Sequence, residues 1–140
     1  MKKTIEELFR SPYWIVDILP AQVPKGSPGQ YFTVEKYYLR DPQLAEIKQK
    51  HINFILKLNC YRDISIEEKA ETNPSPERIA DEMRKRDLCI MIDDSMVLSE
   101  KDDTHLTVFN PDPQLLELAK AIASGEGLFV WKPSASLNAL

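Results

Sequence analysis

Carboxylates and one imidazole are concentrated in a short stretch of this sequence, between residues 93 and 105. The stretch contains five acidic side chains and a histidine, which are Asp93, Asp94, Glu100, Asp102, Asp103 and His105. Such a set offers ligands that Mg²⁺ or Mn²⁺ accepts. However, the alternating ligands, central glycine and terminal glutamate of an EF-hand loop are absent from it. Since aspartate is also favoured in turns, the sequence predicts that residues 99–104 form a solvated turn, with no metal and no cofactor.

Asp17 is the second residue whose type and position could support chemistry. It is the one charged residue in the apolar stretch YWIVDIL, residues 13–19. A neighbouring carboxylate such as Glu35 would raise the pKa of one of the two groups and produce a general acid. A basic neighbour, Lys36 or Arg40, would instead make Asp17 part of a structural ion pair. Carboxylate catalysis at Asp17 therefore stays as an alternative, and no catalytic residue is predicted.

The segment 20–30, PAQVPKGSPGQ, contains three prolines and two glycines. Its order of glycine, lysine and serine is not that of a phosphate-binding loop. The prolines restrict an exposed loop and so lower the entropy cost of binding. We therefore expect Lys25 and Ser27 to be exposed and to contact a partner. Tyr31 and Tyr37 follow in a predicted strand, where they share one face and either contact the same partner or pack under a helix.

The charge and the termini exclude several classes of protein. Lys and Arg number 18 against 22 Asp and Glu, a net charge of −4, so a nucleic-acid partner is unlikely because phosphate contacts need clustered basic residues. The first ten residues, MKKTIEELFR, lack the apolar stretch of a signal peptide, and nowhere does the chain approach the ~18 apolar residues that span a bilayer. We expect a cytoplasmic protein with no membrane contact. Its two cysteines, Cys60 and Cys89, are then expected to be reduced, with a single bridge as the alternative.

The apolar periodicity and the turn residues predict one domain over residues 1–140, with a linker at 67–75 and a frayed tail at 134–140. The predicted helices cover residues 4–10, 41–57, 77–86 and 112–125, and the predicted strands cover residues 13–19, 31–39, 59–66, 88–92, 96–98, 105–109 and 128–131. His51 is expected at the boundary of the apolar stripe of its helix. Each of Asp41-Pro42 and Asp112-Pro113 is expected to cap the helix that follows it.

A repeated pattern suggests that the two halves of the chain share an origin. Residues 41–47 read DPQLAEI and residues 112–118 read DPQLLEL, and they are preceded by FTV and LTV respectively. Convergence on Asp-Pro as a helix start is the alternative explanation. The predicted fold is α+β, a mixed and mostly antiparallel sheet with helices on one face. It is built from two pseudo-repeated α-β-β-α-β halves, residues 1–66 and 76–133.

These observations indicate a bacterial-type cytoplasmic binding or interaction protein without catalytic activity, whose partner is a protein, either a second copy or another chain. The candidate binding residues are Lys25, Ser27, Tyr31 and Tyr37. Two alternatives remain, a small enzyme that uses carboxylates in a cleft between the halves, and a weak nucleic-acid binder. A cleft that contains Asp17 with a raised pKa would favour the enzyme, whereas a flat apolar patch would favour the interaction protein.

Overall fold

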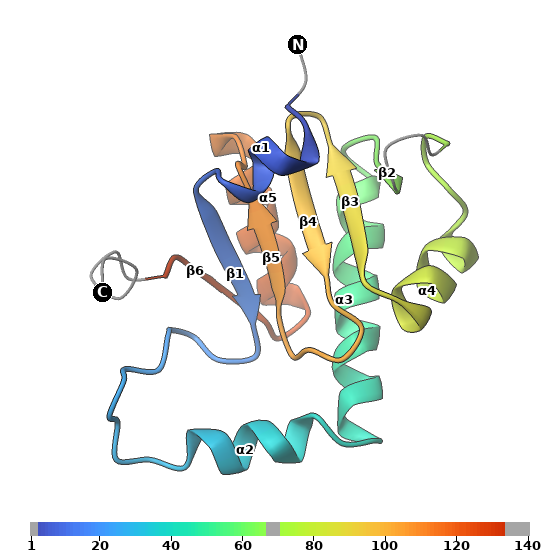
Figure 1. The fold of residues 1–140 in the computed structure, drawn as a ribbon. Coiled ribbons are helices and arrows are strands. Elements are labelled where there is room, and N and C mark those ends of the chain that lie inside the picture. The colour runs from blue at the N-terminus through green and yellow to red at the C-terminus, as the bar shows by residue number, and fades with distance from the viewer. Residues whose placement is uncertain (1–2, 67–70, 134–140) are drawn as a thin grey trace.

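The computed structural model describes residues 3–66 and 71–133. Within these residues the chain forms five helices and six strands (Figure 1). In chain order they are α1 (Ile5–Phe9), β1 (Tyr13–Asp17), α2 (Tyr31–Tyr38), α3 (Gln43–Asn59), β2 (Ser65–Ile66), α4 (Pro76–Lys85), β3 (Leu88–Ile92), β4 (Ser95–Ser99), β5 (Leu106–Phe109), α5 (Pro113–Gly125) and β6 (Phe129–Trp131). The α+β class predicted from the sequence is confirmed.

All six strands belong to one sheet with the order β2-β3-β4-β5-β1-β6. Every neighbouring pair is antiparallel, so the prediction of a mixed sheet is wrong. The predicted hairpin between residues 96–98 and 105–109 is confirmed as β4 and β5. The first strand does not pair with the segment that follows it in the sequence. It lies between β5 and β6, with Trp14 opposite Val108 and Val16 opposite Val130.

Helices α3, α4 and α5 cover one face of the sheet and enclose the main core (Figure 1). Side chains alternate along each strand, so Val16, Ile90 and Val108 point towards these helices. The packing is completed by apolar side chains of the three helices, which are Phe54 and Ile55 of α3, Ile79 and Met83 of α4, and Leu115 and Ile122 of α5. We call the opposite face of the sheet the open face.

The open face is covered at one end only, by the short helix α1. Leu8 of α1 packs there on Met96 and Phe109. Thr4 and Glu7 cap α1 through the predicted reciprocal hydrogen bonds, 3.1 and 2.9 Å long. The prediction that helices lie on one face is therefore wrong for α1, and the remaining part of the open face is available to other segments.

The segment predicted as the strand 31–39 is instead the helix α2. Figure 1 shows it lying across the end of the sheet, reached from β1 by the long irregular segment 18–30. Aromatic and β-branched residues favour strands mainly through packing on neighbouring strands, and here no strand partner is within reach. In a helix the backbone N–H and C=O groups form their hydrogen bonds within the segment, and here Val34 N–H donates to Gln30 O at 2.9 Å. The hydroxyl of Tyr31 adds a contact to Glu35, four residues on.

This helix removes the predicted repeat of the element order. The first half contains one strand between its first helix and α3, whereas the second half contains three strands between α4 and α5. The two Asp-Pro starts also differ, because Asp112 caps α5 by accepting from Leu115 N at 2.8 Å, while no side chain caps α3. The structure shows no repeat.

Several smaller predictions concern the ends of elements. The strand predicted at 59–66 is limited to β2, because α3 continues to Asn59. Part of the linker prediction and the whole tail prediction fall on residues 67–70 and 134–140, outside the described residues. Cys60 and Cys89 are both free thiols. In the part of the chain that the structure describes, none of the helices has the length and the apolarity needed to cross a membrane.

Candidate functional site

A cavity of about 390 Å³ lies on the open face, where α1 does not reach. It is lined by β1 and β6, by His105 of the hairpin between β4 and β5, by the segment 18–30 and by the first turn of α2. We call the segment 18–30 the cavity loop. The volume falls within the range of small-molecule sites, about 300–1,000 Å³.

The register of the sheet places several of the residues that line the cavity. Ile15 is paired with Trp131 of β6 and with Thr107 of β5, so these side chains point to the same face. Asp17 lies two residues beyond Ile15, and His105 lies two residues before Thr107. Period-two alternation therefore brings Asp17, His105 and Trp131 to one cavity although they are far apart in the sequence.

Asp17 is half-buried at the end of β1. Its Oδ1 accepts a hydrogen bond from the backbone N–H of Ile18 at 2.7 Å. Burial raises the pKa of Asp17 above its ordinary value, and the Ile18 hydrogen bond and the charge of His105 oppose that rise. Within the described residues, neither Lys36 nor Arg40 forms the ion pair with Asp17 that the sequence suggested. Glu35 accepts a hydrogen bond from Tyr31 and none from Asp17.

Asp103 and His105 form an ion pair next to Asp17. His105 Nδ1 lies 2.9 Å from Asp103 Oδ1. Burial alone would lower the pKa of His105, but the hydrogen bond and the negative charge of Asp103, helped by Asp17, hold that pKa above its usual value. Burial likewise opposes ionisation of Asp103, yet the contact with His105 keeps its pKa below the usual range. The pair thus presents a positively charged imidazolium beside the cavity in weakly acidic solution.

Tyr31 forms the wall of the cavity from α2. Its hydroxyl donates to Glu35 Oε2 at 2.9 Å. Burial and this hydrogen bond raise the pKa of Tyr31 to about 12. On the opposite side, the indole Nε1–H of Trp131 donates to the backbone carbonyl of Leu19 at 3.1 Å, which fixes the ring against the cavity loop. The aromatic walls are therefore held by hydrogen bonds before any ligand arrives.

Two buried polar side chains of α3 lie behind the hairpin that connects β4 and β5. Lys48 donates from Nζ to Glu100 O at 2.9 Å and to Ser99 Oγ at 3.3 Å. His51 is completely buried, and among the residues that the structure describes neither of its ring nitrogens has a hydrogen-bond partner. The prediction that His51 lies at a boundary is wrong, because α3 turns its ring inward behind the hairpin.

One group of side chains within this hairpin has the composition of a cation site. One ligand atom from each of Glu100, Asp103 and His105 lies within 4.8 Å of the others, and we call these residues the hairpin cluster. Of the acidic residues grouped in the sequence, Asp93 and Asp94 lie elsewhere, in the turn between β3 and β4. The Lys48 ammonium interacts favourably with the acidic residues of the hairpin, so their charge is partly balanced already. The prediction of a solvated turn without metal stays a prediction.

The four predicted binding residues separate in the structure. Lys25 and Ser27 are exposed in the cavity loop and do not line the cavity. Tyr31 lines it, whereas Tyr37 is 46% exposed, contacts the ring of Tyr38, and has the guanidinium of Arg40 over its own ring. Six residues along a helix correspond to a rise of only about 9 Å and to different faces, so the two tyrosines do not share a face as they would in a strand.

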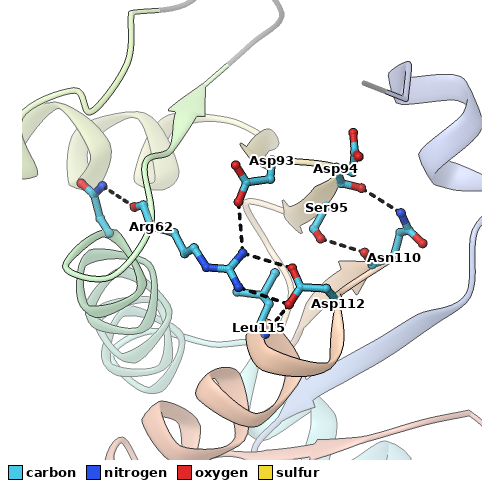
Figure 2. Close-up of polar contacts among 8 residues, drawn as sticks. Arg62, Asp93, Asp94, Ser95, Asn110, Asp112 and Leu115 are labelled. Atoms are coloured by element: carbon cyan, nitrogen blue, oxygen red, sulfur yellow. Dashed lines mark hydrogen bonds and ion pairs between the residues drawn. The ribbon is translucent and has the colours of Figure 1, made fainter. Parts of the chain in front are cut away.

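A second polar cluster lies at the other end of the sheet, around Arg62. Figure 2 shows its guanidinium lying between Asp93 and Asp112, with contacts of 3.0 to 3.2 Å. Asp112 also caps α5, and the hydrogen bonds to both aspartates raise the pKa of Arg62. This cluster joins the end of α3 to the β3–β4 turn and to α5. Its charges are paired with one another, so we assign it a structural role.

Asp17 and His105 can each be singled out in the sequence, but their proximity cannot be predicted from it. The pairing of β1 with β5 brings them together, and nothing in the sequence predicts that these two strands are neighbours in the sheet. Trp131 was assigned only to a last strand, and alternation along that strand could have identified its face. Comparisons with protein-family models, with curated proteins and with solved structures found no match for this chain.

Proposed function

We propose that this protein binds a small organic molecule in the cavity on the open face. The observation that supports the proposal most directly is the arrangement of Asp17, His105 and Trp131 around about 390 Å³ of space. Binding sites for small molecules combine apolar and aromatic walls with a few polar groups that fix orientation. The cavity has both, since Tyr13, Tyr31 and Trp131 provide the walls and the two titratable side chains provide the polar groups.

The placement of the cavity loop also supports a small ligand. The cavity loop and α2 connect β1 to α3 along the chain, and α2 lies across the end of the sheet (Figure 1). No residue of α2 is fully buried, so the helix contributes little to the core. Segments with few buried contacts open at a lower free-energy cost than core elements, which allows a ligand to enter.

The proposal is tested by nuclear magnetic resonance with ¹⁵N-labelled protein and a library of small fragments. We expect the fragments that bind to shift the amide signals of Ile15, Asp17 and His105 and the indole signal of Trp131. The amide signals around Arg62 serve as an internal control, because that cluster lies at the other end of the sheet. If fragments shift signals only outside the cavity, or none bind at millimolar concentration, the proposal is wrong.

A second candidate function is an enzyme that transfers protons at the same cavity. The observation that favours it is the contact between Asp103 Oδ1 and His105 Nδ1, since a carboxylate that holds one imidazole nitrogen leaves Nε2 to exchange a proton with a ligand. The two functions differ in what happens to the ligand. A binding protein returns it unchanged, whereas the enzyme converts it, and His105→Gln would then retain binding while conversion is lost.

A further inference from the structure

We propose that the ligand of this cavity is an organic cation, a small amine with an aromatic or apolar body, whose ammonium group pairs with Asp17. The inference rests on the proposed function and specifies its ligand. It follows from three features of the cavity: the balance of charge, the uncompensated carboxylate and the aromatic walls.

The balance of charge around the cavity is negative. The titratable groups that face it or lie against it are Tyr13 and Asp17 from β1, Glu100, Asp103 and His105 from the β4–β5 hairpin, and Tyr31 and Glu35 from α2. His105 is the single cation among them, and Asp103 already neutralises it. Asp17 and Glu35 therefore leave an excess of negative charge next to the cavity.

Asp17 is half-buried, and no cation among the described residues forms an ion pair with its carboxylate; the charge of His105, which is paired with Asp103, stabilises it only partly. Two lysines of neighbouring elements are engaged on the opposite face of the sheet. Lys132 lies over the ring of Trp14, 4.7 Å from its centre, and Lys48 donates to Ser99 and Glu100. A half-buried carboxylate without a counterion is stabilised by a cation from outside, through a charge-assisted hydrogen bond.

The aromatic walls fit the same ligand. Tyr13, Tyr31 and Trp131 line the cavity together with Asp17. Aromatic rings attract cations through their negative faces and also provide apolar area for the body of the ligand. A neutral or anionic ligand would use the rings but would leave Asp17 without a partner, and an anion would be repelled by it.

The experiment compares two ligands of nearly equal shape, phenethylamine and 2-phenylethanol. Their dissociation constants are measured from the Trp131 indole signal and from the amide signals of the cavity. We expect phenethylamine to bind about tenfold more tightly or better, because a charge-assisted contact is about twice as strong as a neutral hydrogen bond. Nα-acetyl-lysine amide provides a further arm. If it binds more tightly than phenethylamine, the cation belongs to a lysine side chain of a partner, and the small amine proposed here is wrong. The opposite order supports a free amine.

Two variants test the role of Asp17. Asp17→Asn keeps the shape of the side chain and removes its charge, so phenethylamine should bind this variant no better than 2-phenylethanol does. Asp81→Asn is the matched control, because it removes one charge from an exposed ion pair of α4 and should change either affinity by less than about twofold. A well-dispersed amide spectrum of Asp17→Asn confirms that the variant is folded.

Acidification provides an independent readout. Protonation of Asp17 removes its negative charge, and protonation of His105 adds a positive charge beside the cavity. Affinity for phenethylamine should therefore fall in the wild type as the pH is lowered from about 8 to about 4. The fall should be smaller in Asp17→Asn, where His105 titrates but Asp17 does not. The inference is overturned if both ligands bind the cavity equally, if Asp17→Asn binds phenethylamine as the wild type does, or if neither ligand binds. In the first two cases the proposed function stands. It falls as well if the fragment library also leaves the cavity signals unchanged.

Discussion

His51 provides a prediction whose magnitude can be worked out from the structure. Its imidazole is 0% exposed and has no hydrogen-bond partner within the described part of the chain. Burial, reinforced by the neighbouring Lys48 ammonium, lowers the pKa of His51 from 6.5 to about 3. The backbone of Thr104 acts in the opposite direction and raises the pKa of His51, but it forms no hydrogen bond with the ring nitrogens. In the unfolded chain the same imidazole takes up a proton near pH 6.5.

The folded protein should therefore lose stability as the pH falls below about 6.5. In that range the unfolded state binds a proton that the folded state does not, so the free energy of unfolding decreases by up to about 1.4 kcal/mol per pH unit. Between about pH 7 and about pH 5 the loss attributable to His51 is about 2 kcal/mol. This loss would continue towards the folded pKa of about 3, where the acidic residues begin to contribute as well.

Urea unfolding at the two pH values measures this loss in the wild type and in His51→Leu. The variant has a similar volume and no titratable group, so it should lack the loss and be at least as stable at neutral pH, because an unsatisfied buried polar group is removed. His105→Gln is the control, since it keeps His51 and should keep or increase the loss, because the raised pKa of His105 gives a gain of stability on acidification that this variant lacks. If the wild type and His51→Leu show the same change with pH, the buried neutral imidazole is refuted.

Three further predictions concern other parts of the molecule. In urea unfolding, Arg62→Ala should lower the free energy of unfolding by about 1–2 kcal/mol, because it removes both hydrogen bonds to the Asp112 carboxylate. Arg78→Ala removes an exposed ion pair and should lower that free energy by less than about 0.5 kcal/mol. An equal cost for both would contradict the structural role of the Arg62 cluster. Millimolar Mg²⁺, Mn²⁺ or Ca²⁺ should leave Tm nearly unchanged, since the charge of Lys48 partly balances the hairpin cluster. A rise in Tm of several degrees that is lost in the double variant Asp102→Asn, Asp103→Asn would establish a metal site. Calorimetry should show that Tyr37→Ala costs about 1 kcal/mol or less, because this ring is 46% exposed, and a loss of about 3 kcal/mol would make it a core residue.

The elements that could be predicted from the sequence are those with their own local signals. Thr4 with Glu7 predicted the start of α1, and Asp112-Pro113 predicted the start of α5, because capping depends on a few adjacent residues. The apolar runs of β1 and β3 were long enough to be recognised as strands. In each case the physical cause of the structure lies within the segment itself.

The errors came from properties that depend on distant contacts. Residues 31–38 have the composition of a strand, but a strand needs a neighbour, and β1 already lies between β5 and β6. This one error also hid the site, since it placed Tyr31 on a sheet rather than above the cavity. Asp17 and His105 could each be singled out in the sequence, whereas their meeting depends on the register between β1 and β5.

Blocking the cavity tests the central claim most directly. Ala21 lines the cavity from the exposed cavity loop, so Ala21→Trp should fill the space without disturbing the core, while Ser27→Trp adds the same ring to the same loop outside the cavity. The measurement is the dissociation constant of the tightest fragment by isothermal titration calorimetry. We predict a loss of affinity of about tenfold or more in Ala21→Trp and less than about twofold in Ser27→Trp. Unchanged affinity in Ala21→Trp would contradict the assignment of this cavity as the binding site.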